Sequence, residues 1–130
     1  MTGRGSFVSD DKTDFFEEGI ALFNDGKFFE SHEAWEEIWK RSDGDVKLFY
    51  QGLIQAAVAI LHAQRGNLEG ARSLYEKASA KLDPIPSEHM GLAIADLRLE
   101  LTKFIEIATG RKGLPLPAPP RLRRIAKPGA

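Results

Sequence analysis

The sequence of 130 residues contains no cysteine. This absence excludes disulfide bridges, thiolate metal sites and a cysteine nucleophile, so any catalysis would have to come from carboxylates, histidines or a bound ion. The first six residues lack the apolar core of a signal peptide. The most apolar run, residues 53–61, is interrupted by Gln55 and is shorter than the about 20 residues that cross a bilayer. We therefore expect a soluble, cytoplasmic protein that does not enter a membrane.

Acidic residues are lacking at the C-terminal end of the chain. Residues 1–110 contain all 19 acidic residues and 12 basic ones, whereas residues 111–130 contain six basic residues and no acidic one. The formal net charge of −1 therefore hides an acidic body and a basic tail. The prolines of the tail exclude a helix there and favour an extended or polyproline conformation.

The sequence also lacks the alternation of apolar and polar residues that is typical of a strand. Its apolar residues recur instead at the spacing of a helix. The pattern predicts five helices, at about residues 13–24, 28–39, 45–65, 68–82 and 88–109. We therefore expect an all-α fold.

A weak internal repeat indicates how these helices pair. At a shift of 40 residues, Gly26 matches Gly66 and Trp35 matches Tyr75, each within a helix, a glycine turn and a second helix. This unit is similar to the helical hairpin of tetratricopeptide repeats, but two copies are fewer than the about three that a stable stack needs. We therefore predict a compact bundle made of two antiparallel helical hairpins and a C-terminal helix, with the apolar third helix at its centre.

Length and composition are those of one domain, with 42% hydrophobic and 28% charged residues. The pattern divides the chain into a flexible leader at residues 1–12, a helical domain at 13–110 and a basic, proline-rich arm at 111–130.

Both tryptophans lie in the predicted helix at residues 28–39. At helical spacing they share one face of this helix, and Ala34 lies on the opposite face. The face that carries the tryptophans comprises six residues within about 60° of one direction: Phe28, Phe29, His32, Trp35, Glu36 and Trp39. We predict that this face points inward, and that replacing either tryptophan with alanine costs about 3–5 kcal/mol of stability. A histidine and a carboxylate among aromatic rings predict either a pocket or a closed polar network.

A second polar stripe lies on the third predicted helix, where Gln51, Gln55 and His62 point within about 40° of one another. The connection between the second and third helices is so short that they must pack side by side. We therefore predict that the two stripes meet. The candidate site comprises seven residues: His32, Glu33, Glu36, Trp39, Gln51, Gln55 and His62.

Three ordered motifs resemble those of a known family. They are His32-Glu33-x-x-Glu36-x-x-Trp39, then Gln51-Gly52-Leu53-Ile54-Gln55, then Gly66-Asn67-x-x-Gly70. With this spacing the chain resembles, over about residues 15–82, the small all-helical family catalogued as domain of unknown function number three hundred and nine. The resemblance implies an all-helical fold, gives the motif residues as the family's signature, and implies no established activity.

These patterns favour a binding or interaction module, in which the polar cluster is a structural network or a ligand pocket. The alternative is a metal-dependent or acid–base enzyme of the hydrolase type that uses His32, Glu36 and His62. The spacing lacks the second histidine of a zincin and the paired motifs of a di-iron bundle. We therefore expect no cofactor, and a divalent metal is the alternative that the enzyme hypothesis leaves open.

The basic arm has three interpretations: docking on its own acidic body, binding a second subunit or protein partner, and binding nucleic acid. Six positive charges beside an acidic body argue against nucleic acid, whereas docking in the same chain or on a neighbour fits the charge distribution. A small-molecule ligand is also compatible with the sequence. We expect His89 to lie exposed in the first turn of the fifth helix, which Ser87 would cap.

Overall fold

The computed structural model describes residues 11–110 and 115–125, without the side chains of residues 11–13. It confirms the all-α fold. The described elements are α1 (Asp11–Asn24), α2 (Phe28–Trp39), α3 (Gly44–Gln64), α4 (Leu68–Leu82), β1 (Glu88–His89), β2 (Leu92–Ala93) and α5 (Ile94–Gly110). The expected leader at residues 1–12 lies outside the described residues except for its last two positions, which already belong to α1.

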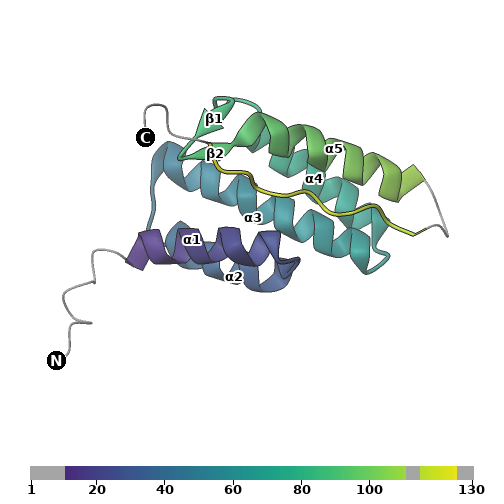
Figure 1. Cartoon of the computed structure of the whole chain (residues 1–130), viewed down its shortest axis with the longest axis horizontal. Coiled ribbons are helices and arrows are strands. Elements are labelled where there is room, and N and C mark those ends of the chain that lie inside the picture. Colours follow the sequence, from purple (N-terminus) through teal and green to yellow (C-terminus); the bar gives the residue numbers. More distant parts are fainter. Residues whose placement is uncertain (1–10, 111–114, 126–130) are drawn as a thin grey trace.

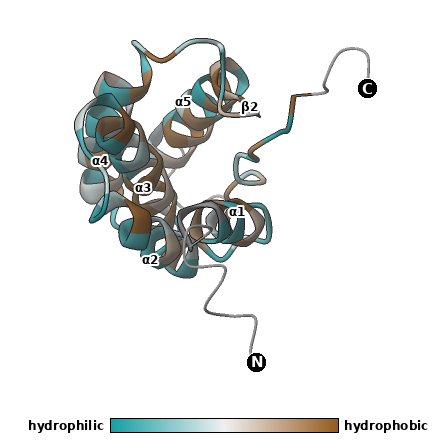
Figure 2. Cartoon of the chain, turned by 90° about the vertical axis from the view of Figure 1, so that its left-hand side faces the viewer, coloured by the Kyte–Doolittle hydropathy of each residue, from teal (hydrophilic) through white to brown (hydrophobic). Residues whose placement is uncertain are grey.

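The helix α3 forms the centre of the bundle, because α2, α4 and α5 all pack against it (Figure 1). By length and composition alone α3 could cross a membrane, but ten of its 21 residues are buried among the other elements, as in the core helix of a soluble protein. Figure 2 shows the five helices as an open ring in which α1 and α5 are the two ends.

The first hairpin closes over Gly26, whose φ of 80° suits glycine, and α1 and α2 pack closely at Gly19. A Cβ atom on Gly19 would lie 2.1 Å from Nε1 of Trp35. The Trp35 indole is fully buried and donates a hydrogen bond of 3.2 Å to the carbonyl of Phe16, and the Ser31 hydroxyl donates one of 2.8 Å to the carbonyl of Gly19. These two bonds satisfy polar groups that would be costly to bury alone.

The inward face of α2 differs from the predicted one. Its buried residues are Phe28, Ser31, Ala34, Trp35 and Ile38. Ala34 was expected on the outside, and the predicted inward residue Phe29 is 45% exposed. The helix is therefore rotated relative to the prediction, because its small residues Ser31 and Ala34 permit the close approach to α1. His32 and Trp39 lie at the flank of the buried face and are only partly buried.

The second hairpin closes over Gly66, and Asn67 caps the start of α4. The Asn67 side chain accepts a hydrogen bond of 3.0 Å from the backbone N–H of Gly70. Along the seam between α3 and α4, Gly52 lies against Leu82: a Cβ atom there would meet the leucine side chain at 2.9 Å. Small residues thus bring these two helices together as well.

The fifth helix begins at Ile94, so the predicted start near Ser87 is wrong. A two-residue hairpin, β1 and β2, precedes it, with Met90 and Gly91 at positive φ in the turn. The carbonyl of Ser87 accepts a hydrogen bond from the N–H of Ala95 instead of its side chain capping the helix. The placement of His89 is also corrected. It belongs to β1 and is half-buried, with its ring edge-on to that of Phe49 at 4.7 Å.

The described part of the arm, residues 115–125, runs between α1 and α5 at the opening of the ring (Figure 1 and Figure 2). Its acidic partners lie on both helices: Arg124 pairs with Glu17 of α1, and Arg123 pairs with Glu100 of α5 at 2.9 Å. Leu122, which directly precedes these two arginines, is 2% exposed and belongs to the core. The arm therefore docks on its own acidic helices and bridges the two ends of the bundle.

Candidate functional site

The predicted residues of α2 are placed on its partly exposed flank. Nε2 of His32 lies 3.2 Å from a carboxylate oxygen of Glu36, and Nδ1 lies 3.2 Å from the carbonyl of Phe29. Both ring nitrogens thus face oxygen atoms of the same helix. Glu33 is exposed. His32 and Glu36 form a surface ion pair of a kind that contributes only a few tenths of a kcal/mol to about 1 kcal/mol.

Trp39 is the last residue of α2, and its side chain contacts α3. The Lys47 ammonium lies 4.5 Å from the centre of a Trp39 ring, a cation–π contact. Nε1 of Trp39 is buried and has no hydrogen-bond partner among the described residues. Trp39 is therefore a half-buried seam residue instead of the central core residue that the sequence predicted.

The predicted stripe on α3 consists of half-buried side chains. Nδ1 of His62 lies 3.1 Å from Nδ2 of Asn67, so this histidine is engaged at the turn into α4. The carbonyl oxygen of the Gln55 side chain is buried without a hydrogen-bond partner in the described part of the chain. Gln51 lies one turn before Gln55 on the same side of the helix.

Within residues 11–110 and 115–125, no hydrogen bond or ion pair links the predicted residues of α2 to those of α3. In the same part of the chain, no three histidines or carboxylates lie close enough together to hold a metal ion. His32 and Glu36 therefore form one group, and His62 belongs to a separate one. The seven-residue site stays a prediction, but the polar contacts that it makes in this structure are local.

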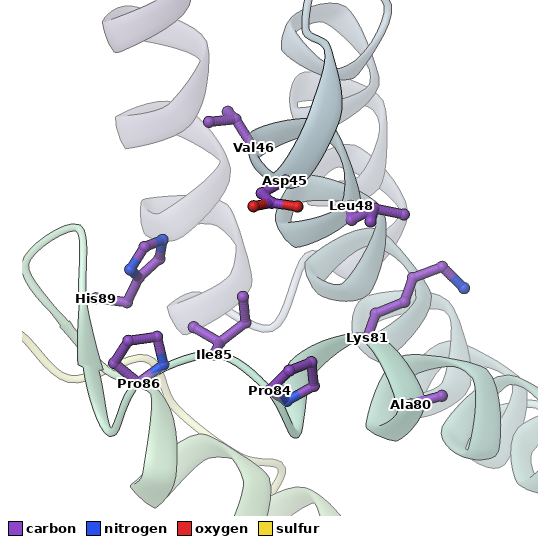
Figure 3. Close-up of a pocket in the computed structure, with 9 residues that line it drawn as sticks. All are labelled: Asp45, Val46, Leu48, Ala80, Lys81, Pro84, Ile85, Pro86 and His89. Carbon is purple, nitrogen blue, oxygen red and sulfur yellow. The ribbon is translucent and has the colours of Figure 1, made fainter.

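A feature that the sequence did not predict is a cavity of about 540 Å³ at the end of the bundle where α3 begins and α4 ends. Figure 3 shows side chains from α3, α4, the connection after α4 and β1 around it. Its walls are mainly apolar, and Val46 and Leu48 on α3 are about half exposed. Nine residues line it: Asp45, Val46, Leu48, Ala80, Lys81, Pro84, Ile85, Pro86 and His89.

The charged groups at this cavity are those of Asp45 and Lys81. Within the described residues, neither Asp45 nor Lys81 pairs with an opposite charge. His89 packs edge-on against Phe49, which fixes its ring at the wall. Neighbouring Tyr50 is 6% exposed, and burial raises the pKa of its phenol, which keeps it neutral. The arrangement offers an apolar surface with one carboxylate and one ammonium group, neither of them paired within the described residues.

The sequence could not reveal this cavity, because its walls come from two separate stretches of the chain, residues 45–48 and 80–89. Each has an ordinary local explanation: the first is the start of a helix, and the second is the end of a helix followed by a proline-containing connection. The one available signal was the exposed pair Val46 and Leu48, which breaks the polar pattern expected at the surface end of a helix.

Comparison with known proteins places most of the helical domain in a family context. Residues 16–74 match the model of the family described as Domain of unknown function (DUF309). An uncharacterized protein of Aquifex aeolicus (strain VF5) is 26% identical over 95 residues, which are 72% of this chain and 28% of that protein. The uncharacterized protein YpuF of Bacillus subtilis (strain 168) is 36% identical over 81 residues, which are 62% of this chain and 44% of that protein.

The matched region thus spans less than half the length of each of these two relatives. The family match begins in α1 and ends within α4, so it covers all seven predicted site residues, whereas the α4 end and the connection that wall the cavity lie beyond it. The resemblance inferred from the sequence motifs is confirmed: residues 16–74 of this helical chain are similar to the DUF309 family, which is described as a domain of unknown function.

Proposed function

We propose that this domain is a binding module that receives an apolar group of its partner in the cavity between α3, α4 and β1. The observation that carries the proposal is the cavity itself, with about 540 Å³ of space and mainly apolar walls. Ligand sites in proteins are typically concave, apolar and about 300–1,000 Å³ in volume, with a few polar groups that orient the ligand. Asp45 and Lys81 supply such groups, since neither is paired within the described residues.

The exposed aliphatic side chains at the cavity support the same proposal. Val46 is 47% exposed and Leu48 is 50% exposed, both on the first turns of α3. Apolar side chains around a hollow add contact area for a partner without contributing to the core of the free protein. The partner's apolar group would be a side chain of another protein or an apolar small molecule.

The alternative is an acid–base or metal-dependent enzyme built on His32, Glu36 and His62, and the geometry gives it less support. His32 pairs with Glu36 on one helix, and His62 pairs with Asn67 at another place. An enzyme of this kind would need His62 to move next to His32 and Glu36. The binding module needs no rearrangement of the described side chains.

The test uses an environment-sensitive apolar dye, anilinonaphthalene sulfonate, as the probe of the cavity. Val46→Asp and Leu48→Asp each place a charge at its wall, and an acidic residue in the first turns of a helix does not disfavour the helix. We expect both variants to lose most of the dye fluorescence of the unaltered protein while keeping its circular dichroism.

Leu99→Asp is the matched control, since Leu99 is a 57% exposed leucine on α5 that does not line the cavity. We expect the control variant to bind the dye like the unaltered protein. Equal dye binding by all three variants and the unaltered protein would contradict the proposal, and backbone amide shifts in NMR spectra would show where the dye binds.

A further inference from the structure

The described part of the arm lies in a groove between α1, the β hairpin and α5, and it is hydrogen-bonded to all three. We call this the α1–α5 groove and define it by Glu17 and Asn24 of α1, Gly91 and Ala93 of the β hairpin, and Glu100 of α5. The arm segment 115–125 lies in this groove in an extended conformation (Figure 1). A single antiparallel β-bridge joins its Arg124 to Leu92 of the β hairpin.

The first element of recognition is a clamp on the peptide backbone. Oδ1 of Asn24 accepts a hydrogen bond of 2.7 Å from the N–H of Leu122, and Nδ2 of Asn24 donates one of 2.9 Å to the carbonyl of the same residue. These bonds span 98 positions of the sequence. An amide side chain can bond to both the N–H and the carbonyl of one residue in an extended peptide. Such bonds do not depend on which side chain that peptide residue carries.

The second element is strand addition at the edge of the β hairpin. The N–H of Ala93 donates a hydrogen bond of 2.9 Å to the carbonyl of Arg123, and the N–H of Ile125 donates one of 3.0 Å to the carbonyl of Gly91. Addition of an extended peptide to a sheet edge is a common mode of peptide recognition, in which the backbone gives affinity and the side chains give specificity.

The third element reads side chains. Leu122 is buried among core residues, while Arg123 and Arg124 on its C-terminal side point to Glu100 and Glu17. Oε2 of Glu100 accepts hydrogen bonds from both the Nε and the Nη2 atoms of Arg123, two adjacent donors that a lysine does not have. The groove thus holds a leucine followed by two arginines.

We propose that the α1–α5 groove is a docking site for an extended basic segment of another protein chain, with an apolar anchor followed by arginines, and that the arm is its resident competitor. The groove contacts the backbone, one leucine and two arginines of the arm, and a segment with the same groups from another chain could make the same contacts. A tethered arm acts at an effective concentration of the order of millimolar, so a free segment enters only when the arm is weakened or the segment binds more tightly.

This inference is independent of the cavity, because no residue of the groove lines it. A negative dye experiment would therefore not contradict the proposal for the groove, and a negative peptide experiment would not contradict the proposal for the cavity.

The test measures fluorescence polarisation of a labelled peptide with the sequence of residues 115–125 on the full chain. In the variant Arg123→Ala/Arg124→Ala, the arm loses both ion pairs but keeps its buried leucine, so the fold should survive. We expect this variant to bind the peptide about tenfold more tightly than the unaltered chain, because its own arm competes less. Raising the salt concentration should weaken this binding, because the pairs are exposed.

Asn24→Ala added to the double variant is the groove control. Within the described residues the Asn24 side chain bonds only to the backbone of Leu122, so this change removes the clamp and nothing else. We expect it to abolish the gain in affinity, as should a peptide that carries Leu122→Asp.

Two results would overturn the proposal. One is a double variant that keeps the circular dichroism of the unaltered chain and binds the peptide no better than it. The other is peptide binding that Asn24→Ala leaves unchanged. If the double variant does not fold, Arg124→Ala alone is the substitute, since it removes one exposed pair.

Discussion

In the α1–α2 hairpin and in the α3–α4 hairpin the chain reverses over a glycine with nearly the same backbone angle. Gly26 has a φ of 80° and Gly66 has a φ of 79°. In each hairpin a second glycine allows the helices to approach closely, Gly19 in the first and Gly52 in the second. The two hairpins therefore share their turn and their spacing.

The hairpins differ in what fills the seam between the helices. In the first, the buried indole of Trp35 lies on Gly19, and two side-chain hydrogen bonds join the helices. In the second, small residues such as Ala71 and Ala78 are buried, and beyond the turn no side-chain hydrogen bond joins α3 to α4 in the part of the chain that the structure describes. A seam of directed bonds should tolerate change less well than a seam held by small apolar surfaces.

The sharpest test of this comparison is the tryptophan of the first seam. Trp35→Ala removes a fully buried indole and its bond to Phe16, so we expect a loss of about 3–5 kcal/mol in the free energy of unfolding. Trp39→Ala removes a half-buried ring outside this seam, and we expect about 1–2 kcal/mol. Urea denaturation of both variants measures the difference. Equal losses would show that the α1–α2 seam has no special weight.

The two seam glycines should respond unequally to the same change. In Gly19→Ala the new methyl group meets the Trp35 indole at 2.1 Å, and a ring held by a hydrogen bond cannot turn away, so we expect a loss of about 2–4 kcal/mol. In Gly52→Ala the nearest atom is the flexible end of Leu82 at 2.9 Å, and we expect about 1–2 kcal/mol.

A double variant of the first seam separates a steric clash from other causes. If the methyl group at position 19 acts through the indole, Gly19→Ala combined with Trp35→Leu should cost clearly less than the sum of the two single changes. Additive losses would show that Gly19→Ala destabilises the protein by some cause other than a clash with the indole. Gly52→Ala, measured in parallel, gives the cost of the same change where no tryptophan is in contact.

The smallest effect concerns the shared turn. Gly26→Ala and Gly66→Ala introduce no contact within 4 Å, so their cost is that of a left-handed conformation for alanine, about 1 kcal/mol each. Thermal unfolding should show similar shifts for the two variants. A clear inequality would mean that the two turns are less alike than their backbone angles indicate.

Much of the first hairpin could be predicted from the sequence, because its signals are local. The helix lengths and the glycine stop at Gly26 follow from neighbouring residues. The direction of the inward face could not be predicted, although the periodicity was correct. It is decided by the close approach of Gly19 to α2, which favours Ser31 and Ala34 at the contact over the larger His32.

The candidate site shows the same division. The i, i+4 spacing of His32 and Glu36 predicts that they are neighbours, and they form an ion pair. Whether His62 joins them depends on the rotation of two helices, and the structure places it beside Asn67 instead.

The sequence by itself determined the five helices, the two glycine turns and the opposite charges of body and arm, because these properties depend on residues close together in the chain. The tertiary structure alone decided the rotation of α2, the cavity beside Val46 and the groove in which Asn24 holds Leu122. Each of these depends on contacts between residues far apart in sequence. Whether such contacts form depends on how side chains of different elements fit together, and no local pattern records that fit.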